Sequence, residues 1–355
     1  MSQLAILRDY SLTGADGRRA LERGLANATW YRAPIPRARL KELMQRSDGP
    51  ALRDTLIWIA AFAVTGGLGA WLWLQGSWWA IPCLIAYGVL YGSSSDSRWH
   101  EAGHGTAFRT PWLNDAVYHV ACFMVLREPT VWRWSHARHH TDTLIVGRDP
   151  EIALMRPIVV LRAILLFLAV PQVIATTKSL THHALGRLSP DEATLIPESE
   201  RPKVYRTARI WLAIHALVIG LAIWLGSWLP VLLVGPLPSM YGGWLHVIFG
   251  FTQHGGLAED VLDHRLNSRS VLMNPVFRFL YWNMNYHVEH HMFPMVPYHR
   301  LPELHEALKP YCPPPAQSLV AAYREIIPAL WRQVRDPGYY IRRSLPEAAQ
   351  TAAAE

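Results

Sequence analysis

Four uninterrupted apolar blocks constrain the fold of this chain more than any other feature. They cover residues 56–75, 77–92, 210–226 and 228–251. A helix that crosses a bilayer needs about 20 mostly apolar residues, so 77–92 is slightly short and the others suffice. The chain also holds 16 tryptophans, which are enriched where a membrane meets water. We therefore expect an all-α integral membrane protein with four transmembrane helices.

The short turns between these blocks predict how they are arranged. QGS (75–77) joins the first two blocks and GSW (226–228) joins the last two. Neither turn contains Lys or Arg, whereas the polar segments at the opposite ends of the blocks do. Basic residues accumulate on the cytoplasmic side of a membrane. We expect two hairpins with outward-facing turns, both termini in the cytoplasm, and a location in the cell inner membrane.

The blocks divide the chain into three regions. Residues 1–51 are predicted to form a cytoplasmic N-terminal segment with an interfacial helix that begins at Pro36. Residues 52–310 are predicted to form the membrane domain, with a cytoplasmic helical cap. Residues 311–355 are expected to hold a cytoplasmic C-terminal helix and a disordered tail, EAAQTAAAE.

A further apolar segment, 157–177, is long enough to cross but is not expected to do so. Arg162 lies inside it and Pro171 would interrupt it. A crossing here would also place the similar histidine clusters before and after it on opposite sides of the membrane. We expect an interfacial or re-entrant helix at 157–177, and a shorter interfacial helix at 112–126.

Cysteine usage and charge exclude several classes of protein. The cysteines Cys83, Cys122 and Cys312 form no CxxC pair, so neither a disulfide framework nor a zinc knuckle is indicated. The formal net charge is +7. The basic residues flank the apolar blocks and form no aromatic-interleaved stripe, so we expect no nucleic-acid partner.

Three histidine clusters indicate the chemistry of the chain. They are HEAGH (100–104), HARHH (136–140) and HVEHH (287–291). Residues three and four apart share one face of a helix, so each cluster presents its imidazoles in one direction. If the three helices converge, they bring together eight nitrogen ligands, and one zinc ion takes only about four. The eight are His100, His104, His136, His139, His140, His287, His290 and His291.

Five histidines outside the clusters are expected to be structural or surface residues, because a lone histidine is seldom a metal ligand. These are His119, His215, His264, His299 and His305. The pair at 182–183 lies in a polar segment and is expected to be solvated.

The three clusters and their surroundings resemble the three histidine boxes of the membrane fatty acid desaturase and hydroxylase superfamily. HARHHTDTLIVGRDPEI resembles the second box of that family, and NYHVEHHMFPMVPYHRLPELH resembles the third. The resemblance covers roughly residues 52–310. It implies a non-haem di-iron centre that uses O2 as a co-substrate, with the eight box histidines as ligands of two Fe ions.

The resemblance also implies one further ligand upstream of the third box. TQHGG places His254 there, just after the last apolar block, and His246 is the alternative eight residues earlier. We favour His254. Carboxylates commonly orient ligand imidazoles through the far ring nitrogen, and the candidates for this role are Asp96, Glu101, Asp149 and Glu289.

Two reactions remain open after the removal of a first hydrogen from an alkyl chain. Removal of a second hydrogen from the next carbon gives an alkene, and addition of oxygen gives an alcohol. The third box, with a central Glu and a preceding Asn-Tyr, resembles desaturases more than alkane hydroxylases. We therefore expect a desaturase acting on an aliphatic, by default fatty acyl, chain, with a hydroxylase as the alternative.

The chain has no means of taking electrons from a nicotinamide. It contains no Rossmann Gly-x-Gly-x-x-Gly motif after a strand and no iron–sulfur cysteine set. We expect an external ferredoxin-like electron donor, with its reductase. An acidic donor would be attracted to the basic residues after the third box, which are Arg300, Lys309, Arg324, Arg332 and Arg335.

Two other classes of protein stay open on sequence grounds. A di-zinc hydrolase would use fewer histidines and more carboxylates. A non-enzymatic metal-binding membrane protein, such as a transporter, would need ionisable residues within its spans, and His215 is the one clear candidate there.

Overall fold

The computed structural model describes residues 8–346, and within that range the fold is helical, without strands. The predicted all-α class is confirmed for these residues. Two isolated bridges, between Ser270 and Tyr286 and between Val271 and Ala316, are the only β-type pairs in the described part of the chain. The predicted disordered tail, 347–355, lies outside the described residues.

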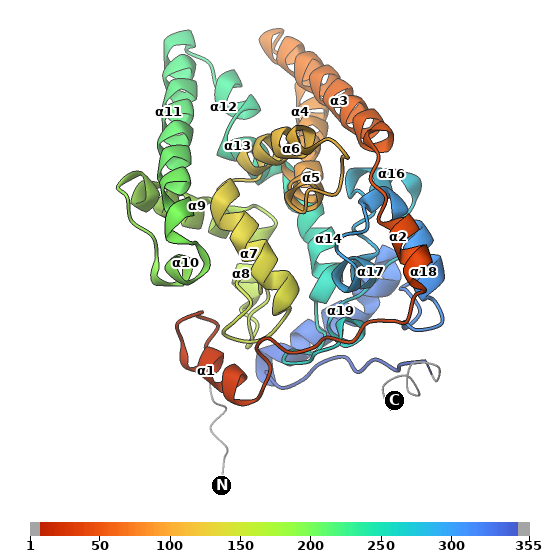
Figure 1. Cartoon of the computed structure of the whole chain (residues 1–355). Helices are drawn as coiled ribbons and strands as arrows, with labels where there is room; N and C mark the ends of the chain where they lie inside the picture. The colour runs from red at the N-terminus through yellow and green to blue at the C-terminus, as the bar shows by residue number, and fades with distance from the viewer. Residues whose placement is uncertain (1–7, 347–355) are drawn as a thin grey trace.

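The helices follow one another closely along the chain (Figure 1). In order they are α1 (Ala15–Glu22), α2 (Arg37–Leu43), α3 (Asp48–Leu74), α4 (Ala80–Gly88), the π-helix η1 (Val89–Ser93), α5 (Ser94–Gly103), α6 (Pro111–Met124), α7 (Pro129–Thr141), α8 (Val160–Leu166), α9 (Val170–Ala184), α10 (Pro190–Leu195), the 3₁₀-helix η2 (Glu198–Glu200), α11 (Arg201–Leu225), α12 (Leu229–Leu233), α13 (Pro236–Gly242), α14 (Trp244–His254), α15 (His264–Asn267), α16 (Pro275–Leu280), α17 (His287–Met292), the 3₁₀-helix η3 (Tyr298–Arg300), α18 (Leu301–Leu308) and α19 (Leu319–Arg335).

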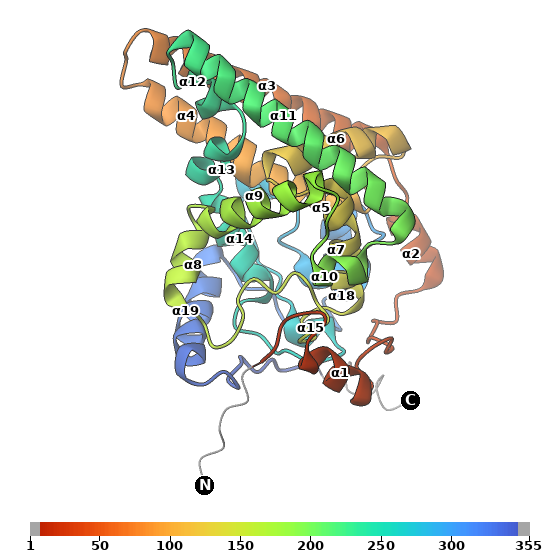
Figure 2. The ribbon, with the colours of Figure 1, turned by 90° about the vertical axis from the view of Figure 1, so that its left-hand side faces the viewer.

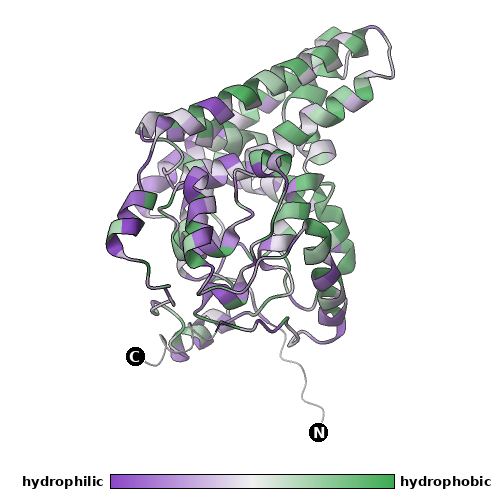
Figure 3. Cartoon of the chain, turned by 90° about the vertical axis from the view of Figure 1, so that its right-hand side faces the viewer, coloured by the Kyte–Doolittle hydropathy of each residue, from purple (hydrophilic) through white to green (hydrophobic). Residues whose placement is uncertain are grey.

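Two helical segments are long and apolar enough to cross a membrane, Arg37–Leu74 and Glu198–Leu225. Their side chains face outward, since Val64 is 65% exposed and Ile223 is 76% exposed. Figures 2 and 3 show that the apolar helices α3, α4, α11 and α12 project together from one end of the molecule. Apolar side chains that face outward on such helices are typical of contact with lipid.

The other two expected spans are not single α-helices. Residues 80–103 form one continuous rod of α4, η1 and α5, which runs from the apolar end into the first histidine cluster. The segment 228–251 is divided among α12, α13 and α14 instead of forming one span. Gly235 interrupts it with a φ of +102°, and Pro236 starts the next helix. Proline cannot continue a preceding helix and glycine tolerates positive φ, so the chain breaks there.

The apolar segment around 157–177 is also broken. Its two helices, α8 and α9, meet at an angle of 79°, and together they could form one broken span or a re-entrant loop. Ala169 at the bend has a φ of +51°, and Pro171 lies in the first turn of α9. The expectation that this segment does not cross stays a prediction.

A close backbone contact aligns the continuous segment 80–103 with the broken segment 228–251. Gly88 at the end of α4 packs directly against Gly242 at the end of α13, where a Cβ atom on either glycine would overlap its neighbour. The Ser93 hydroxyl donates to the Gly242 carbonyl at 2.6 Å and accepts from the His246 amide at 3.0 Å. This contact fixes where α5 and α14 begin, and both helices carry histidines at their other ends.

The N-terminal segment wraps around the polar half of the molecule. It passes from α1 under α7 and α15 to α2, as Figures 1 and 2 show. The Tyr31 amide donates to the Leu262 carbonyl at 3.1 Å, and Ala33 and Leu43 belong to the main apolar core. That core includes buried side chains of α17 and α18, together with Trp282.

Candidate metal centre

Four helices bring nine histidines to one place in the polar half of the molecule. His100 lies on α5 and His104 caps its C-terminal end. The other seven lie on α7, α14 and α17, and they are His136, His139, His140, His254, His287, His290 and His291. α7 begins in a defined position because Glu128 caps it and Pro129 occupies its first turn. These nine residues are the nine expected from the sequence.

The first group of histidines contains five side chains, from α5, α7 and α17. One ring nitrogen of each lies within 4.8 Å of the corresponding nitrogens of the other four. His136 Nε2 is 3.0 Å from His104 Nε2 and 3.1 Å from His140 Nε2. His140 Nε2 is in turn 3.2 Å from His290 Nε2, and the His100 ring completes the group.

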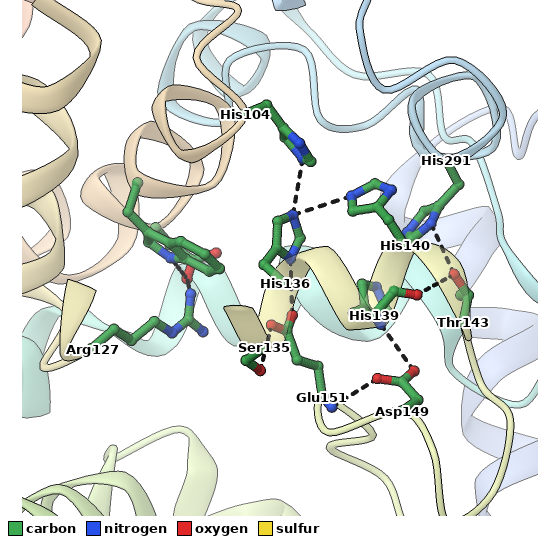
Figure 4. Close-up of polar contacts among 12 residues, drawn as sticks. His104, Arg127, Ser135, His136, His139, His140, Thr143, Asp149, Glu151 and His291 are labelled. Atoms are coloured by element: carbon green, nitrogen blue, oxygen red, sulfur yellow. Dashed lines mark hydrogen bonds and ion pairs between the residues drawn. The ribbon is translucent and has the colours of Figure 1, made fainter. Parts of the chain in front are cut away.

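The second group contains four histidines, His139, His254, His287 and His291, again within 4.8 Å. His287 Nε2 is 3.0 Å from both His254 Nε2 and His291 Nε2. The two groups touch, since the rings of His140 and His291 are stacked with their centroids 4.4 Å apart. Figure 4 shows His104, His136 and His140 facing one another, with His139 and His291 beside them.

The spacing of these nitrogens fits metal ions. Two imidazole nitrogens that each lie about 2.1 Å from one ion and approach it at a right angle are about 3.0 Å apart. Neutral imidazoles that face each other through Nε2 without an ion would instead crowd their lone pairs or their protons. In each group the facing atom is Nε2, which leaves Nδ1 free for a partner in the protein. Two all-imidazole sites therefore suit two transition-metal ions.

Burial keeps most of these imidazoles in the form that binds metals. Burial, with a smaller contribution from the charge of His139, lowers the pKa of His104 to about 4 and that of His254 to about 3. A neutral imidazole has a free lone pair, whereas a protonated one does not. His139 is the exception. Burial alone would lower its pKa, but the charge and hydrogen bond of Asp149, together with the charge of Glu151, raise it to about 9.

A loop after α7 holds two of the imidazoles by their far nitrogens. His139 Nδ1 donates to Asp149 Oδ2 at 2.9 Å, as the sequence predicted for Asp149. His136 Nδ1 donates to Glu151 Oε2 at 3.1 Å, and Ser135 holds the other oxygen of that carboxylate. The Glu151 amide donates to Asp149 Oδ1 at 2.8 Å, so the two carboxylates are fixed together (Figure 4).

Three such partners were missed from the sequence. Glu151 lies two residues after Asp149 in the quoted GRDPEI, and that spacing was the available signal. The Thr143 hydroxyl donates to the His139 carbonyl and accepts from His291 Nδ1 at 3.2 Å. The Asn267 carbonyl accepts from His254 Nδ1 at 2.8 Å, a backbone contact that no side-chain pattern reveals.

Three of the predicted carboxylates contact other groups and not the nine histidines. Asp96 pairs with Arg127 at 2.6 Å and accepts from Trp99 Nε1. Glu101, one residue after His100, turns away and accepts from Thr106 and from the Tyr298 amide. Successive helical residues point about 100° apart, so a carboxylate next to a ligand in sequence faces elsewhere.

Glu289 likewise lies inside the third cluster but bonds Ser270 and His305. His305 is therefore a structural partner, as expected.

The alternatives to the nine lie outside both groups. His246, the competitor of His254, belongs to neither group. His183 pairs with Glu192 at 3.1 Å and is buried, although it was expected to be solvated. His264 is also buried, and its ring centroid is 5.1 Å from that of His291, so it borders the second group without joining it.

Comparison with known proteins identifies relatives that are fatty acid desaturases. "Omega-3 fatty acid desaturase, chloroplastic" of Glycine max is 27% identical over 304 residues, which are 80% of this chain and 65% of that protein. "sn-2 acyl-lipid omega-3 desaturase (ferredoxin), chloroplastic" of Arabidopsis thaliana is 27% identical over 313 residues, 80% of this chain and 66% of that protein. A second Arabidopsis protein, "Acyl-lipid omega-3 desaturase (cytochrome b5), endoplasmic reticulum", is 24% identical over 78% of this chain and 74% of its own length.

The chain thus spans slightly less than two thirds of the length of the first two relatives. A family model described as "Fatty acid desaturase" matches residues 77–322, a range that contains all nine histidines. Because that match covers well over half of the sequence, the chain belongs to the fatty acid desaturase family.

Proposed function

We propose that this chain is an O2-dependent di-iron desaturase that introduces a double bond into an aliphatic, by default fatty acyl, chain. The observation that carries the proposal is the pair of touching all-histidine groups, five residues in one and four in the other. The relatives named as omega-3 fatty acid desaturases support the same reaction class.

The donor sets favour iron over zinc. Zinc sites in proteins are almost always tetrahedral, and the first group offers five imidazoles. Imidazole also suits iron, which accepts higher coordination numbers and, unlike zinc, changes its oxidation state. Bound iron with O2 would supply the oxidising power that removal of hydrogen from an unactivated carbon needs.

The residues of the chain would hold and orient that centre. His100, His104, His136, His140 and His290 would bind one ion, and His139, His254, His287 and His291 the other. Asp149 and Glu151 fix the tautomer and ring orientation of His139 and His136, so that Nε2 faces the ions. All nine rings are buried or nearly so, which keeps bulk water away from the reacting carbon.

We propose a multi-pass arrangement in the cell inner membrane with four crossings. α3 and α4 would form one hairpin, and α11 with the broken segment α12–α14 the other. The outward-facing apolar side chains of the two long helices support this arrangement. The histidine groups and both termini would then lie on the cytoplasmic side, where an acyl chain could enter the site from the bilayer.

The electrons would come from an external one-electron carrier with its own reductase. The relatives whose names specify a donor use ferredoxin or cytochrome b5. A ferredoxin-like protein is the expected class of partner.

Product analysis tests the proposal. The purified protein, loaded with iron and supplied with a reduced ferredoxin, is given a deuterated saturated acyl lipid under ¹⁸O2, and the products are analysed by mass spectrometry. We expect loss of two hydrogens from adjacent carbons and no ¹⁸O in the product. A product that carries one ¹⁸O atom would identify a hydroxylase instead. The His136→Ala variant provides the inactive control.

A further inference from the structure

An aromatic stack leads from the surface to the second histidine group. Trp30, in the segment between α1 and α2, is half-buried, and its indole lies parallel to the His264 ring with centroids 4.3 Å apart. The His264 ring is in turn 5.1 Å from the His291 ring. Trp30 is held in place because its Nε1 donates to the Thr141 carbonyl at 3.0 Å. These rings form a continuous contact path between the solvent and one proposed ligand.

A basic cleft lies on the same side of the molecule as this stack. It has a volume of about 250 Å³ and lies between α1 and the end of α7 with its following loop. Its lining includes Arg18, Arg138 and Arg148. Arg138 and Arg148 share the buried Asp142, and the three arginines are the charged residues among those that line the cleft. Arg138 lies on α7, the helix that also carries His139 of the second group.

The surface around Trp30 adds to this positive charge. Arg32 is exposed and follows Trp30 by two residues. Among residues 8–346, neither Arg18 nor Arg32 has an ion-pair partner. Arg18 lies on α1, and Arg32 lies in the segment between α1 and α2. Figure 2 shows α1 and this segment at the end of the molecule opposite the tips of α3 and α11. A soluble protein can therefore reach this surface without meeting the apolar helices.

We propose that a small acidic one-electron carrier docks over the cleft between α1 and α7, and that its electron enters through Trp30 and His264 to His291. This inference rests on the proposed function. In each step the reduced carrier loses one electron and one ferric ion of the centre becomes ferrous, while Trp30 and His264 provide close contacts for tunnelling and keep their own oxidation state. Two such steps make the centre ready for O2.

This surface suits the carrier better than the basic residues after the third box. Arg300 and Lys309 are each paired with a glutamate three residues away, at 2.6 Å in both cases. Arg324 and Arg335 are exposed on α19, but exposed apolar side chains such as Trp331, 62% exposed, accompany them. No ring of α19 contacts a ring of the nine histidines within the described residues.

Binding of the carrier tests the docking surface independently of turnover. The probe is an acidic plant-type [2Fe–2S] ferredoxin, and its affinity is measured by calorimetry at several salt concentrations. The double variant Arg18→Glu/Arg32→Glu should weaken binding about tenfold or more at low salt, with the difference shrinking as salt rises. Arg324→Glu/Arg335→Glu on α19 is the matched control and should bind almost as the unchanged protein does. The reverse ranking of the two variants would overturn the docking site.

Electron transfer tests the aromatic path. The ferredoxin is mixed anaerobically with iron-loaded protein in a stopped-flow instrument, and its oxidation is followed by absorbance at saturating concentration. Trp30→Leu should slow this step about tenfold, while Trp30→Phe, which keeps a ring over His264, should restore most of the rate. Trp134→Leu is the control, because Trp134 also reaches the surface, where it is 38% exposed, but contacts no ring of the path.

Two further readouts separate the possible failures. Iron content and the rate of reduction by dithionite should be unchanged in Trp30→Leu, because dithionite needs no docking site. A normal ferredoxin rate in Trp30→Leu would overturn the path while leaving the desaturase proposal intact. If the unchanged protein binds no iron, or cannot be reduced even by dithionite, the proposed function itself fails.

Discussion

Asp149 and Glu151 each hold one imidazole by its far nitrogen, and this makes them sensitive single residues. Removal of such a carboxylate commonly lowers metal affinity about 10- to 100-fold, because the ring loses its orientation and its tautomer. We expect Glu151→Gln and Asp149→Asn to lose iron at correspondingly lower chelator concentrations. Iron retained per chain is measured during a chelator titration.

Glu192→Gln provides the control for these variants. Glu192 also holds a buried histidine, His183, but neither residue belongs to a histidine group. The Glu192→Gln variant should therefore retain iron as well as the unchanged protein does. Equal iron loss in Glu192→Gln and Glu151→Gln would mean that the effect is general destabilisation and would count against the role of Glu151.

Single residues also show what sequence could and could not predict. Helical spacing was enough to select eight of the nine histidines, because i, i+3 and i+4 positions share a face whatever the rest of the fold does. His254 stands alone in the sequence, and only the family resemblance pointed to it. The carboxylates depend on loop geometry instead. Asp96 precedes His100 by about one turn yet pairs with Arg127, a residue 31 positions away. Nothing local in the sequence records such a pairing.

At the scale of elements, α1 supports the loop that carries Asp149 and Glu151. Gly17 on α1 packs against Gly147 in that loop, and a Cβ on Gly17 would lie 2.7 Å from the Gly147 carbonyl oxygen. Gly147 also has a φ of +74°. We expect Gly147→Ala to displace α1 from the loop, to lower the melting temperature, and to weaken iron binding.

Gly186→Ala is a close match for this comparison. Gly186 has a φ of +75°, but open space surrounds it. It should therefore show only the cost of a side chain at positive φ, about 1 kcal/mol, with unchanged iron binding. If the two alanine variants behave alike in thermal melts and iron titrations, the α1 contact does not support the loop.

The N-terminal cap of α7 predicts a pH dependence. Burial raises the pKa of Glu128 from its ordinary value of 4.5 to about 7. A carboxyl group whose pKa is higher in the folded protein binds its proton more tightly there, so its contribution to stability falls as pH rises from about 4.5 to 7. The loss from this group amounts to at most about 3 kcal/mol.

Glu128→Gln keeps an oxygen acceptor for the Val131 amide but cannot ionise. The unchanged protein loses this stability as pH rises, whereas the variant does not. The melting temperature of Glu128→Gln minus that of the unchanged protein should therefore increase from pH 5 to pH 8. A difference that stays constant across that range would show that Glu128 does not titrate there.

The elements also show where sequence prediction failed. The apolar blocks predicted α3 and α11 well, because length and composition alone decide whether a helix can span. The block 228–251 became three helices because Gly235 adopts a φ of +102° and prolines follow it. Hydropathy averages over such breaks and therefore could not reveal them.

At the scale of the whole molecule, the proposed topology makes a direct prediction. If α8 and α9 do not cross, a residue after α9 lies on the cytoplasmic side. In intact cells an impermeant thiol reagent should label Gln75→Cys, in the turn after α3, but not Glu198→Cys. Both should react after the cells are opened. Labelling of Glu198→Cys from outside would mean that the bent pair spans the membrane.

The overall arrangement was predictable only in part. The sequence indicated a helical membrane protein with a polar half that brings distant histidines together, and the helices of residues 8–346 agree. The division into two histidine groups was not predicted. It depends on how α7 and α17 cross, so that neighbouring residues such as His139 and His140 enter different groups.

The metal content of the purified protein tests the central claim most directly. Protein prepared anaerobically and reconstituted with iron is analysed for metals per chain, together with one variant in each histidine group, His136→Ala and His287→Ala. His299→Ala, outside both groups, is the control. We predict about two iron ions per chain for the unchanged protein and the control, and about one for each group variant. A single iron ion, or stoichiometric zinc that iron cannot replace, would contradict the account.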